Sequence, residues 1–406
     1  MEQFEKLGLS KDVLCVLKEA GFKTPSEIQE KTIPLALSGK DIIGGSATGS
    51  GKTLAFASAI IENLKPNKKV QALILTPTRE LAEQVSDSIT HFSRNKNLKV
   101  TAVYGGVNME QQIRRIRYSD VIVGTPGRLL DHLKRRTLNL DYVKFLVLDE
   151  VDRMFDMGFS QDVETILHKC PRDRQTMMFS ATISADVEFL AKKHAKNPIK
   201  ISAETYIDAS KLKQIYYDVQ QNKKFSLLVH LLKKESQELI MVFCNTRRNV
   251  DFVFENLNNK GIRAEAIHGG LSQNNRTRVL GEFKKKNVKV LVCTDVAGRG
   301  LDIKGVGNIY NYNIPKISTD YIHRIGRTAR AGENGKVVNI ISSEDYLFFR
   351  KVMEDGTMKE SMKEEELPEF EIINARPQIR RRNFSRENVM NNSNRRFGGR
   401  RNFRRR

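Results

Sequence analysis

The chain contains few cysteines, and none of them is spaced for pairing or for binding zinc. The four are Cys15, Cys170, Cys244 and Cys293. No two of them form a C-x-x-C pair, and no group of His and Cys residues has the spacing of zinc ligands. A disulfide-stapled secreted protein is therefore disfavoured. We expect four free and mostly buried thiols in a reducing compartment.

Long hydrophobic runs are also missing. No apolar stretch approaches the ~18–20 residues that a membrane-spanning helix needs. The first five residues lack the basic and apolar regions of a signal peptide. We therefore expect a cytoplasmic protein with no membrane partner.

Acidic residues are too few to balance the basic ones. The chain has 69 Lys and Arg residues against 48 Asp and Glu residues, which is a net charge of +21 at pH 7. Such an excess favours a polyanionic partner, either nucleic acid or an anionic membrane. The excess is uneven, because residues 374–406 contain twelve arginines and a single acid, Glu387.

This arginine-rich tail has almost no aliphatic side chains, so we expect it not to fold alone. Arginine is interleaved there with Phe and Gly, as in residues 395–401. The combination suits a mobile binder of single-stranded RNA, because guanidinium groups pair with phosphates and aromatic rings stack on bases. The alternative is a solubilising tail without selectivity.

The hydrophobic pattern predicts an α/β protein with two open parallel sheets in tandem. Short β-branched runs alternate with helical patterns, and the runs are apolar on both faces, as in parallel strands covered by helices. In the first half the predicted strands are Ile42–Ile43, Val70–Leu75, Val100–Val103, Val121–Val123, Phe145–Leu148, Thr176–Phe179 and Ile199–Ile201. In the second half they are Gln214–Val219, Leu239–Phe243, Ala264–Ile267, Val288–Val292, Ile309–Tyr312 and Val337–Ile341.

At 406 residues the chain has room for about two domains and a tail. Changes in composition place the first domain at residues 1–203, a polar linker at 204–213 and the second domain at 214–355. Residues 356–406 form an acidic patch followed by the disordered tail.

Helices are predicted at the beginning of the first domain and at the end of the second. Residues 1–39 predict two helices, the first capped by Ser10 and the second with Pro25 at its first position. A helix over Glu344–Met353 is predicted to close the second domain.

A glycine-rich turn between a strand and a helix is the first stretch that carries chemistry. The glycines and the helix N-terminus direct backbone N–H groups at phosphate oxygens, Lys52 would reach the β/γ-phosphates, and the Thr53 hydroxyl would ligate Mg²⁺. A glycine-rich turn with a stray Gly-Lys-Thr fits less well, since both flanking elements have the required pattern. The predicted ATP-binding residues of this loop are Ser46, Ala47, Thr48, Gly49, Ser50, Gly51, Lys52 and Thr53.

An apolar strand that ends in acids is the second such stretch. After Phe145–Leu148 come Asp149, which would hold Mg²⁺, and Glu150, which would orient and deprotonate the attacking water. The alternative is a strand end with solvated acids, which is common for one acid. It is less fitting for Asp149, Glu150 and Asp152 downstream of a phosphate loop.

With the phosphate loop, this Asp-Glu-Val-Asp box resembles the DEAD-box ATP-dependent RNA helicases of helicase superfamily 2. The resemblance covers residues 4 to about 350, and its motifs recur in the family's order. In the first half they are Phe4, Gly21-Phe22, Pro25, Ile28 and Gln29 of the Q motif, Pro77-Thr78-Arg79-Glu80-Leu81, Gly105-Gly106, Thr125-Pro126-Gly127-Arg128 and Ser180-Ala181-Thr182. In the second half they are Val242–Thr246, His268-Gly269, Gln273, Arg276, Thr294–Asp302 and His323–Arg330.

The resemblance implies two RecA-like domains that bind ATP and Mg²⁺. It implies that Phe22 stacks on adenine, that Gln29 reads it and that Asp302 binds the ribose. The Gln29 amide offers one acceptor and one donor, which match adenine N6 and N7 but not the edge of guanine. Without the resemblance, a packed aromatic and a surface amide would be the simpler interpretation of Phe22 and Gln29.

The resemblance also implies arginine fingers, Arg327 and Arg330, which lie one helical turn apart and can point at one γ-phosphate. A basic helix that faces RNA is the competing interpretation, and it stays open for Arg324. The residues that would couple hydrolysis to unwinding are Asp152, Ser180, Thr182 and His323, with His323 contacting Asp152 across the cleft.

The implied RNA contacts fall on short loops after strands. Their N–H, hydroxyl and guanidinium groups suit phosphates and 2′-OH groups, so we expect single-stranded RNA and short duplexes to bind without sequence readout. For Gly105-Gly106 alone, an ordinary turn is the simpler interpretation. The implied RNA-binding residues are Pro77, Thr78, Arg79, Gly105, Gly106, Thr125, Pro126, Gly127, Arg128, Asn245, Gln273, Arg276, Thr294 and Arg299.

Three positions depart from the family pattern: Val151, Ser46 and Gly298. Val151 matters most, because overpacking a tight site by two methyl groups costs about 1–3 kcal/mol if neighbours do not adjust. With Asp149, Glu150 and Asp152 intact, we expect the chemistry to persist.

The sequence therefore predicts an RNA-stimulated ATPase that unwinds short RNA duplexes locally and remodels ribonucleoproteins, acting as a monomer. Ribonucleoprotein or ribosome-assembly proteins are the candidate partners. An ATP-gated RNA clamp or annealing chaperone is the alternative, and Val151 gives it some weight. A DNA helicase of the same superfamily is disfavoured by the Q motif.

Overall fold

The computed structural model describes residues 1–45, 49–202, 211–235, 238–298, 303, 305–329, 334–354 and 362–375. Most of the predicted linker and the arginine-rich tail lie outside these ranges. None of the helices in these ranges combines the length and apolar character that crossing a bilayer requires. The predicted site residues outside them are Ser46, Ala47, Thr48, Arg299, Asp302 and Arg330.

The first half of the chain forms a seven-stranded sheet in the order β3-β4-β2-β5-β6-β1-β7, and every neighbouring pair is parallel. This confirms the predicted parallel α/β architecture. The strands are β1 Ile42–Gly45, β2 Ala72–Leu75, β3 Val100–Val103, β4 Val121–Gly124, β5 Phe145–Asp149, β6 Gln175–Ser180 and β7 Ile199–Ser202.

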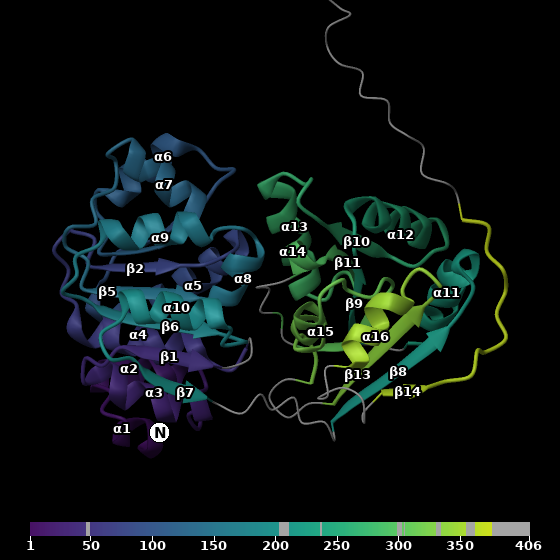
Figure 1. Cartoon of the computed structure of the whole chain (residues 1–406), viewed down its shortest axis with the longest axis horizontal. Coiled ribbons are helices and arrows are strands. Elements are labelled where there is room, and N and C mark those ends of the chain that lie inside the picture. Colours follow the sequence, from purple (N-terminus) through teal and green to yellow (C-terminus); the bar gives the residue numbers. More distant parts are fainter. Residues whose placement is uncertain are drawn as a thin grey trace, which may run out of the picture. The chain divides into compact units, whose positions relative to one another are not determined.

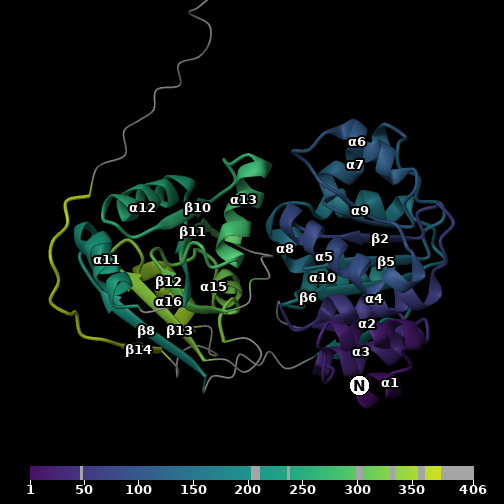
Figure 2. The ribbon, with the colours of Figure 1, turned by 180° about the vertical axis from the view of Figure 1, so that it is seen from behind.

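Alternate strand residues belong to two separate buried clusters, one on each face of this sheet. Leu73 and Leu146 belong to one cluster, while Ala72 and Phe145 belong to the other. Helices that contribute to the Ala72 cluster are α2 Lys11–Glu19, α3 Glu27–Leu37, α4 Lys52–Asn63 and α5 Arg79–Phe92. Helices that contribute to the Leu73 cluster are α6 Met109–Ile116, α7 Pro126–Lys134, α8 Val151–Asp156, α9 Ser160–Lys169 and α10 Ala185–His194. Figures 1 and 2 view these two layers from opposite sides.

The second half forms another seven-stranded parallel sheet, in the order β10-β11-β9-β12-β13-β8-β14. Its strands are β8 Leu212–Asp218, β9 Leu239–Cys244, β10 Ala264–Ile267, β11 Val290–Thr294, β12 Val306–Asn311, β13 Gly335–Ile341 and β14 Met362–Glu364. Its helices are α11 Lys224–Lys234, α12 Arg247–Asn259, α13 Gln273–Lys284, α14 Asp295–Gly298, α15 Ser318–Ile325 and α16 Tyr346–Glu354.

The N-terminal prediction needs two corrections. A short extra helix, α1 Glu2–Lys6, precedes the two that were expected, and it buries Phe4. The helix α3 begins after Ser26 instead of Thr24, so Pro25 is not its first residue. Ser26 and Gln29 form a capping box, in which the Ser26 N–H donates to Gln29 Oε1 at 3.0 Å.

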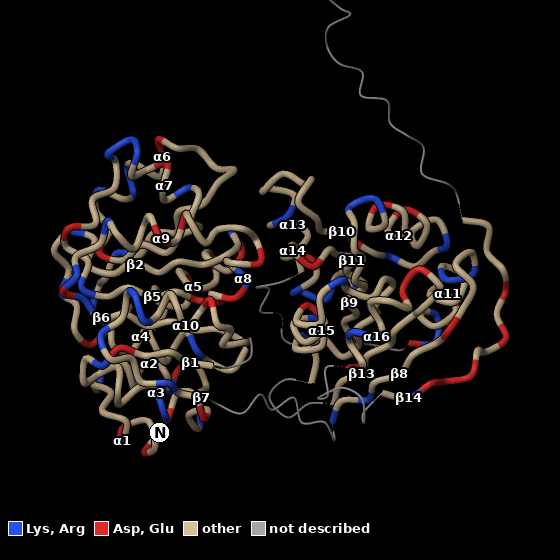
Figure 3. Tube along the Cα trace, viewed as in Figure 1, with Lys and Arg blue, Asp and Glu red and all other residues tan. Residues whose placement is uncertain are grey.

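Residues 362–374 lie on the second domain, although the sequence interpretation assigned them to the tail region. The strand β14 pairs in parallel with β8, and the Glu365 N–H then donates to the Tyr216 carbonyl at 3.0 Å. Farther along, the Ile373 N–H donates to Ser226 Oγ at 2.9 Å. Figure 3 shows acidic residues along this segment. Backbone hydrogen bonds hold this segment to β8 and to α11, and Met362 is buried in the apolar core of the second domain.

Arg324 is a structural residue of the second domain, which answers the question that the sequence left open. The side chain is 1% exposed, and it makes a bidentate ion pair with Asp295 at 2.6 and 2.7 Å. Its other N–H groups donate to Asn311 Oδ1, to the Asn313 carbonyl and to Asn245 Oδ1. All five guanidinium donors are therefore used inside the domain.

We expect Arg324→Met to destabilise the second domain by about 3 kcal/mol, because removing one partner of a buried ion pair leaves the other uncompensated. Urea unfolding followed by circular dichroism measures this change. The variant Arg350→Met, at an exposed arginine of α16, is the matched control and should unfold like the unchanged protein. Equal unfolding of both variants would contradict the structural role.

Candidate functional site

The predicted catalytic residues come together because their strands are neighbours. In the sheet, β1 lies beside β6, and β6 lies beside β5. The carboxyl ends of parallel strands share one edge, which is where open α/β sheets bind ligands. That edge carries the phosphate loop after β1, the Asp149 box at the end of β5 and Ser180 at the end of β6.

Two glycines in the described part of the phosphate loop have the positive φ values that this kind of turn requires. Gly49 and Gly51 have φ values of 84° and 91°, a region that side chains rarely adopt, and Gly51 caps α4. A Cβ on Gly51 would lie 2.3 Å from Gln29 Nε2. Glycine is therefore required here by both conformation and space.

Gln29 has a role that the sequence did not reveal, since its amide joins the Q motif to the phosphate loop. Gln29 Nε2 donates to the Gly51 carbonyl at 3.1 Å, and Ser26 Oγ donates to the Ser50 carbonyl at 2.7 Å. A change in the Q motif would thus be transmitted to the loop. Adenine recognition by Gln29 stays a prediction.

Phe22 is half-buried, with its ring edge-to-face with Phe4 at 6.3 Å and with Phe92 at 6.0 Å. These contacts fix the ring orientation. Stacking of Phe22 on adenine stays a prediction.

Lys52 and Asp149 face each other at the catalytic edge. Lys52 Nζ lies 4.0 Å from Asp149 Oδ1, and both side chains are buried. Burial raises the pKa of Asp149 to about 6, against the opposing charge of Lys52. Asp149 Oδ1 has no hydrogen-bond partner among the described residues. A buried carboxylate oxygen that accepts no hydrogen bond fits a hydrated Mg²⁺ ion. Thr53, the other predicted metal-binding residue, is the second residue of α4.

Glu150 is held as a carboxylate by positive charges from both domains. Burial alone would raise the pKa of Glu150, but Arg153, Lys52, Arg327 and His323 outweigh it and lower the pKa to about 2. Arg153 Nη1 donates to Glu150 Oε2 at 2.7 Å. Glu150 has a left-handed backbone, with φ at 57°. The side chain is therefore ionised at neutral pH.

Asp152 ties the Asp-Glu-Val-Asp box to the Ser180-Ala181-Thr182 motif. Its Oδ2 accepts hydrogen bonds from the Thr182 N–H at 2.9 Å and from Thr182 Oγ1 at 3.0 Å. The Asp152 N–H donates to Ser180 Oγ at 3.2 Å. These contacts connect residues that the resemblance assigns to coupling. A contact of Asp152 with His323 stays a prediction.

Val151 lies in the apolar core of the first domain. It is fully buried and belongs to the same apolar cluster as Met154 and Met178. Asp149, Glu150 and Asp152 keep the contacts described above. The effect of Val151 on hydrolysis stays a prediction.

We expect Val151→Ala to lower the unfolding free energy by about 1–2 kcal/mol, because it removes two buried methyl groups and leaves a cavity. The RNA-stimulated kcat should change less than about twofold. Chemical unfolding and steady-state ATPase assays measure the two effects. A large change in kcat with unchanged stability would show that Val151 acts on the site itself.

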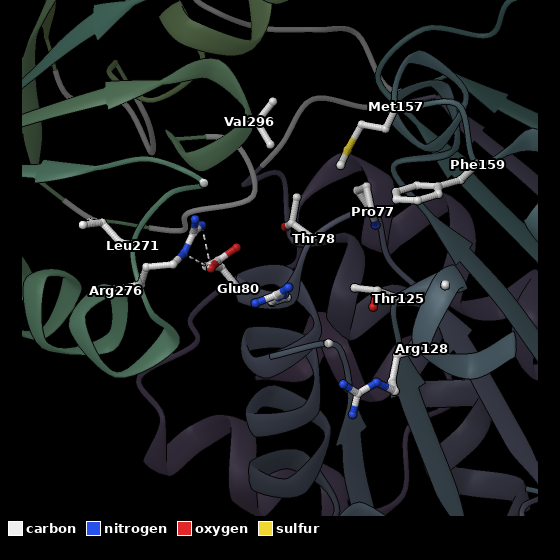
Figure 4. Close-up of a pocket in the computed structure, with 14 residues that line it drawn as sticks. Pro77, Thr78, Glu80, Thr125, Arg128, Met157, Phe159, Leu271, Arg276 and Val296 are labelled. Atoms are coloured by element: carbon white, nitrogen blue, oxygen red, sulfur yellow. Dashed lines mark hydrogen bonds and ion pairs between the residues drawn. The ribbon is translucent and has the colours of Figure 1, made fainter. Parts of the chain in front are cut away.

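A second group of predicted residues lines a cavity of about 340 Å³ to which both domains contribute. Figure 4 shows Leu271, Arg276 and Val296 of the second domain opposite Pro77, Thr125 and Phe159 of the first. The predicted RNA-binding residues that line it are Pro77, Thr78, Arg79, Gly105, Thr125, Gly127, Arg128 and Arg276.

Glycine beside this cavity makes room for an arginine. A Cβ on Gly106 would lie 2.2 Å from Arg79 Nη1, and Gly106 has φ at 87°. Gly105-Gly106 is therefore more than an ordinary turn, because it lets the Arg79 guanidinium lie directly against the backbone. Contact of Arg79, Gly105 and Gly106 with RNA stays a prediction.

A hydrogen-bond chain orients Arg128. Arg128 Nη1 donates to Gln112 Oε1 at 3.1 Å, and His132 Nε2 lies 3.1 Å from the same oxygen. Gln112 Nε2 donates to the Tyr104 carbonyl, so Oε1 is the amide oxygen and His132 donates to it. His132 is fully buried, and burial, with the charge of Arg128, lowers its pKa.

The first domain should lose stability as pH falls below about 6.5, the pKa of an unfolded histidine. The lowered pKa means that His132 binds a proton less readily in the folded state than in the unfolded state. Its contribution to the free energy of unfolding is therefore present above about pH 6.5 and is lost as the pH falls below that value. Unfolding free energies measured across this range test the effect. In His132→Gln the free energy of unfolding should depend less steeply on pH. An unchanged dependence would show that other groups cause it.

Several predicted RNA-binding residues are engaged inside the protein. Asn245 Nδ2 donates to the Ile314 carbonyl at 2.7 Å, while its Oδ1 accepts from Arg324. Arg276 Nε donates to Glu80 Oε1 at 2.7 Å, so this ion pair links the second domain to the first. Gln273 and Thr294 are buried. Their RNA contacts stay predictions.

The sequence analysis missed the apolar part of the cavity. Met157, Phe159, Leu271 and Val296 line it, and Val296 is 49% exposed. The signal was a Met-Gly-Phe turn after the Asp-Glu-Val-Asp helix, where apolar residues flank Gly158 in a short connection. Such side chains suit contact with the sugars or bases of a strand.

Comparisons with known proteins cover both domains. A family model described as DEAD/DEAH box helicase matches residues 26–190. A model described as helicase conserved C-terminal domain matches residues 223–332.

Curated relatives match most of the chain. The DEAD-box ATP-dependent RNA helicase CshA of Geobacillus kaustophilus is 44% identical over 349 residues, covering 85% of this chain and 74% of the relative. The CshA protein of Bacillus subtilis is 43% identical over 371 residues, covering 90% of this chain and 75% of the relative.

Solved structures agree with these sequence matches. S. cerevisiae Dbp5 bound to RNA and ADP BeF3 has a TM-score of 0.83 and 29% identity, covering 90% of this chain and 96% of that one. The DEAD-box helicase Mss116 bound to ssRNA and UDP-BeF has a TM-score of 0.80 and 28% identity, covering 89% of this chain and 78% of that one.

Proposed function

We infer that this chain, which belongs to the DEAD-box family of ATP-dependent RNA helicases, hydrolyses ATP to separate short RNA duplexes locally and without processive movement. The observation that carries the proposal is the joint electrostatic environment of Glu150. Lys52 and Arg153 of the first domain and Arg327 of the second all act on this carboxylate. Such an arrangement makes hydrolysis depend on both domains.

The roles at the catalytic edge follow from position and charge. Lys52 and the N–H groups around Gly51 bind the phosphates, and Glu150 takes the proton of the attacking water. Arg327 neutralises charge that develops on the γ-phosphate. Asp149 and the Thr53 hydroxyl would hold Mg²⁺, which would neutralise further phosphate charge.

RNA binding is proposed for the cavity lined by Arg79, Arg128 and Arg276. Its cationic and N–H groups suit the backbone of one strand, and its apolar side chains suit stacked sugars or bases. A strand bent to fit there could no longer pair regularly, so a short duplex would open locally. The Ser180 and Thr182 contacts of Asp152 offer the route by which hydrolysis releases that strand.

Further predictions belong to the same proposal. We propose that the protein acts in the cytoplasm as a monomer, and that it remodels ribonucleoproteins, with ribosome-assembly proteins as candidate partners. The arginine-rich tail would bind RNA through its guanidinium groups and aromatic rings.

The direct test is steady-state ATPase activity without nucleic acid, with single-stranded RNA, and with DNA of matching sequence. Strong stimulation by RNA alone supports the proposal. Equal stimulation by DNA would favour a DNA helicase of the same superfamily. The absence of ATPase activity in all three reactions, with ATP-dependent RNA binding retained, would favour the RNA clamp.

Duplex separation and strand annealing distinguish a helicase from an annealing chaperone. Both rates should be measured for the full chain and for a version ending at Ala375, because Ile373 still bonds to the second domain. ATP-dependent separation by both versions supports a helicase. Annealing without separation would support the chaperone.

A further inference from the structure

Two histidines and a glutamate meet on the first domain, and none of them is assigned to ATP or RNA. Glu164 and His168 lie one turn apart on α9, and His194 is the last residue of α10. One ligand atom from each lies within 4.8 Å of the others. The two imidazole rings are 5.1 Å apart, and both helices cover the same face of the sheet (Figure 1).

One nitrogen of this cluster is buried without a partner. His194 Nε2 makes no hydrogen bond within the part of the chain that the structure describes, although the atom is shielded from water. Such an atom costs free energy unless something binds its lone pair or its proton. A metal ion coordinated by the ring would remove that cost.

The other two groups can adjust to an ion. The side chains of His168 and Glu164 are 59% and 36% exposed, and His168 Nε2 lies 3.8 Å from Glu164 Oε1. Zinc–ligand distances of about 2.0–2.2 Å require the ligand atoms to approach more closely than they do here. Rotation of the two exposed side chains provides that movement on a short timescale.

Helix position also favours a cation. His168 and His194 each lie in the last turn of a helix, where the negative end of the macrodipole points. Lys193 competes, because its ammonium forms an ion pair with Glu164 Oε1. This pair is partly exposed, and surface ion pairs of this kind are weak.

We propose that Glu164, His168 and His194 bind one divalent transition-metal ion of the zinc class. Two imidazoles and one carboxylate are a donor set that suits Zn²⁺ and not Mg²⁺ or Ca²⁺, which prefer oxygen ligands. Water occupies the remaining position. The ion fastens α9, which follows the Asp-Glu-Val-Asp helix, to α10, which follows the Ser180-Ala181-Thr182 motif.

Titration of the full chain with Zn²⁺ in a calorimeter, without ATP and with excess Mg²⁺ present, tests this proposal. We expect one saturable site and a rise in the thermal unfolding midpoint on the order of 5 °C at saturation. Co²⁺ in place of Zn²⁺ should show the visible absorption of an ion with mixed nitrogen and oxygen ligands.

Variants separate this site from adventitious binding. His168→Asn and His194→Asn should each weaken Zn²⁺ binding at least about tenfold, since even outer-shell partners of a metal contribute that much. Lys193→Gln should strengthen it about threefold by removing the competitor. His91→Asn, at an exposed histidine of α5, is the matched control.

His168 is exposed, so its variant should fold normally and keep the RNA-stimulated ATPase activity. This keeps the test decisive even if the half-buried His194 position does not tolerate change. Zn²⁺ affinity that is the same in the unchanged protein and in His168→Asn would overturn the proposal. So would a complete absence of saturable Zn²⁺ binding.

Discussion

Replacing Arg327 with lysine is expected to lower RNA-stimulated ATP hydrolysis by about 10³-fold, because an arginine finger contributes about that much and lysine lacks its planar fork. Arg327 is 3% exposed, and its charge acts on Glu150 from the other domain. Its Nε donates to the His323 carbonyl at 3.1 Å, which aims the guanidinium. ATP and RNA binding should change little, since the loss falls on the transition state.

Single-turnover hydrolysis with saturating RNA measures the effect of Arg327→Lys without interference from product release. Arg350→Lys, on the surface of the same domain, is the matched control and should hydrolyse ATP normally. The thermal unfolding midpoint of both variants shows whether the second domain remains folded. A folded Arg327→Lys protein with normal kcat would remove the residue from catalysis.

Arg324 and Arg327 show where sequence reasoning reaches its limit. Both lie in the same basic stretch, and their spacing allows either to face a phosphate. What separates them is tertiary, because Asp295, Asn311 and the Asn313 carbonyl surround Arg324 and leave it no donor for a ligand. The local sequence does not predict these partners, because they lie at the ends of strands that are distant in the chain.

The parallel sheets were predictable because a strand that is buried on both faces consists of an unbroken run of apolar residues. In β4 all four residues are buried, so its run of apolar residues could not belong to a half-exposed strand. The strand β14 has no such run, with only Met362 buried. It was missed because it pairs with the edge of β8 through its backbone, and its few side-chain contacts, such as Glu364 with Tyr216 Oη, have no strand pattern.

Among the functional sites, too, some residues were predictable from the local sequence and others were not. Lys52 and Asp149 were predictable, since each follows a buried strand and parallel strands end at one edge. The cluster of Glu164, His168 and His194 was not, because the zinc spacings known from sequence assume that ligands share a loop or hairpin. Here a helix pair on one face of the sheet brings them together.

Replacing Glu150 with glutamine should lower RNA-stimulated ATP hydrolysis by about 10²–10³-fold, because the amide cannot take the proton of the attacking water. The pKa of Glu150, lowered to about 2, keeps the carboxylate ionised over the whole physiological range. Glutamine has nearly the same shape, so phosphate binding through Lys52 and Gly51 should persist. We therefore expect ATP to bind and RNA to stay bound, since the step that releases the strand is blocked.

Rapid-quench hydrolysis and the dissociation rate of labelled RNA in the presence of ATP test this prediction together. The change also replaces the buried ion pair of Glu150 with Arg153, so urea unfolding must accompany the kinetics. Glu110→Gln, on the exposed start of α6, controls for loss of a carboxylate elsewhere in the domain. Slow hydrolysis with rapid RNA release would indicate that Glu150 positions the attacking water and does not take its proton. Normal hydrolysis in a folded Glu150→Gln protein would require a different base, and Asp149, whose pKa is raised to about 6, would be the residue to test next.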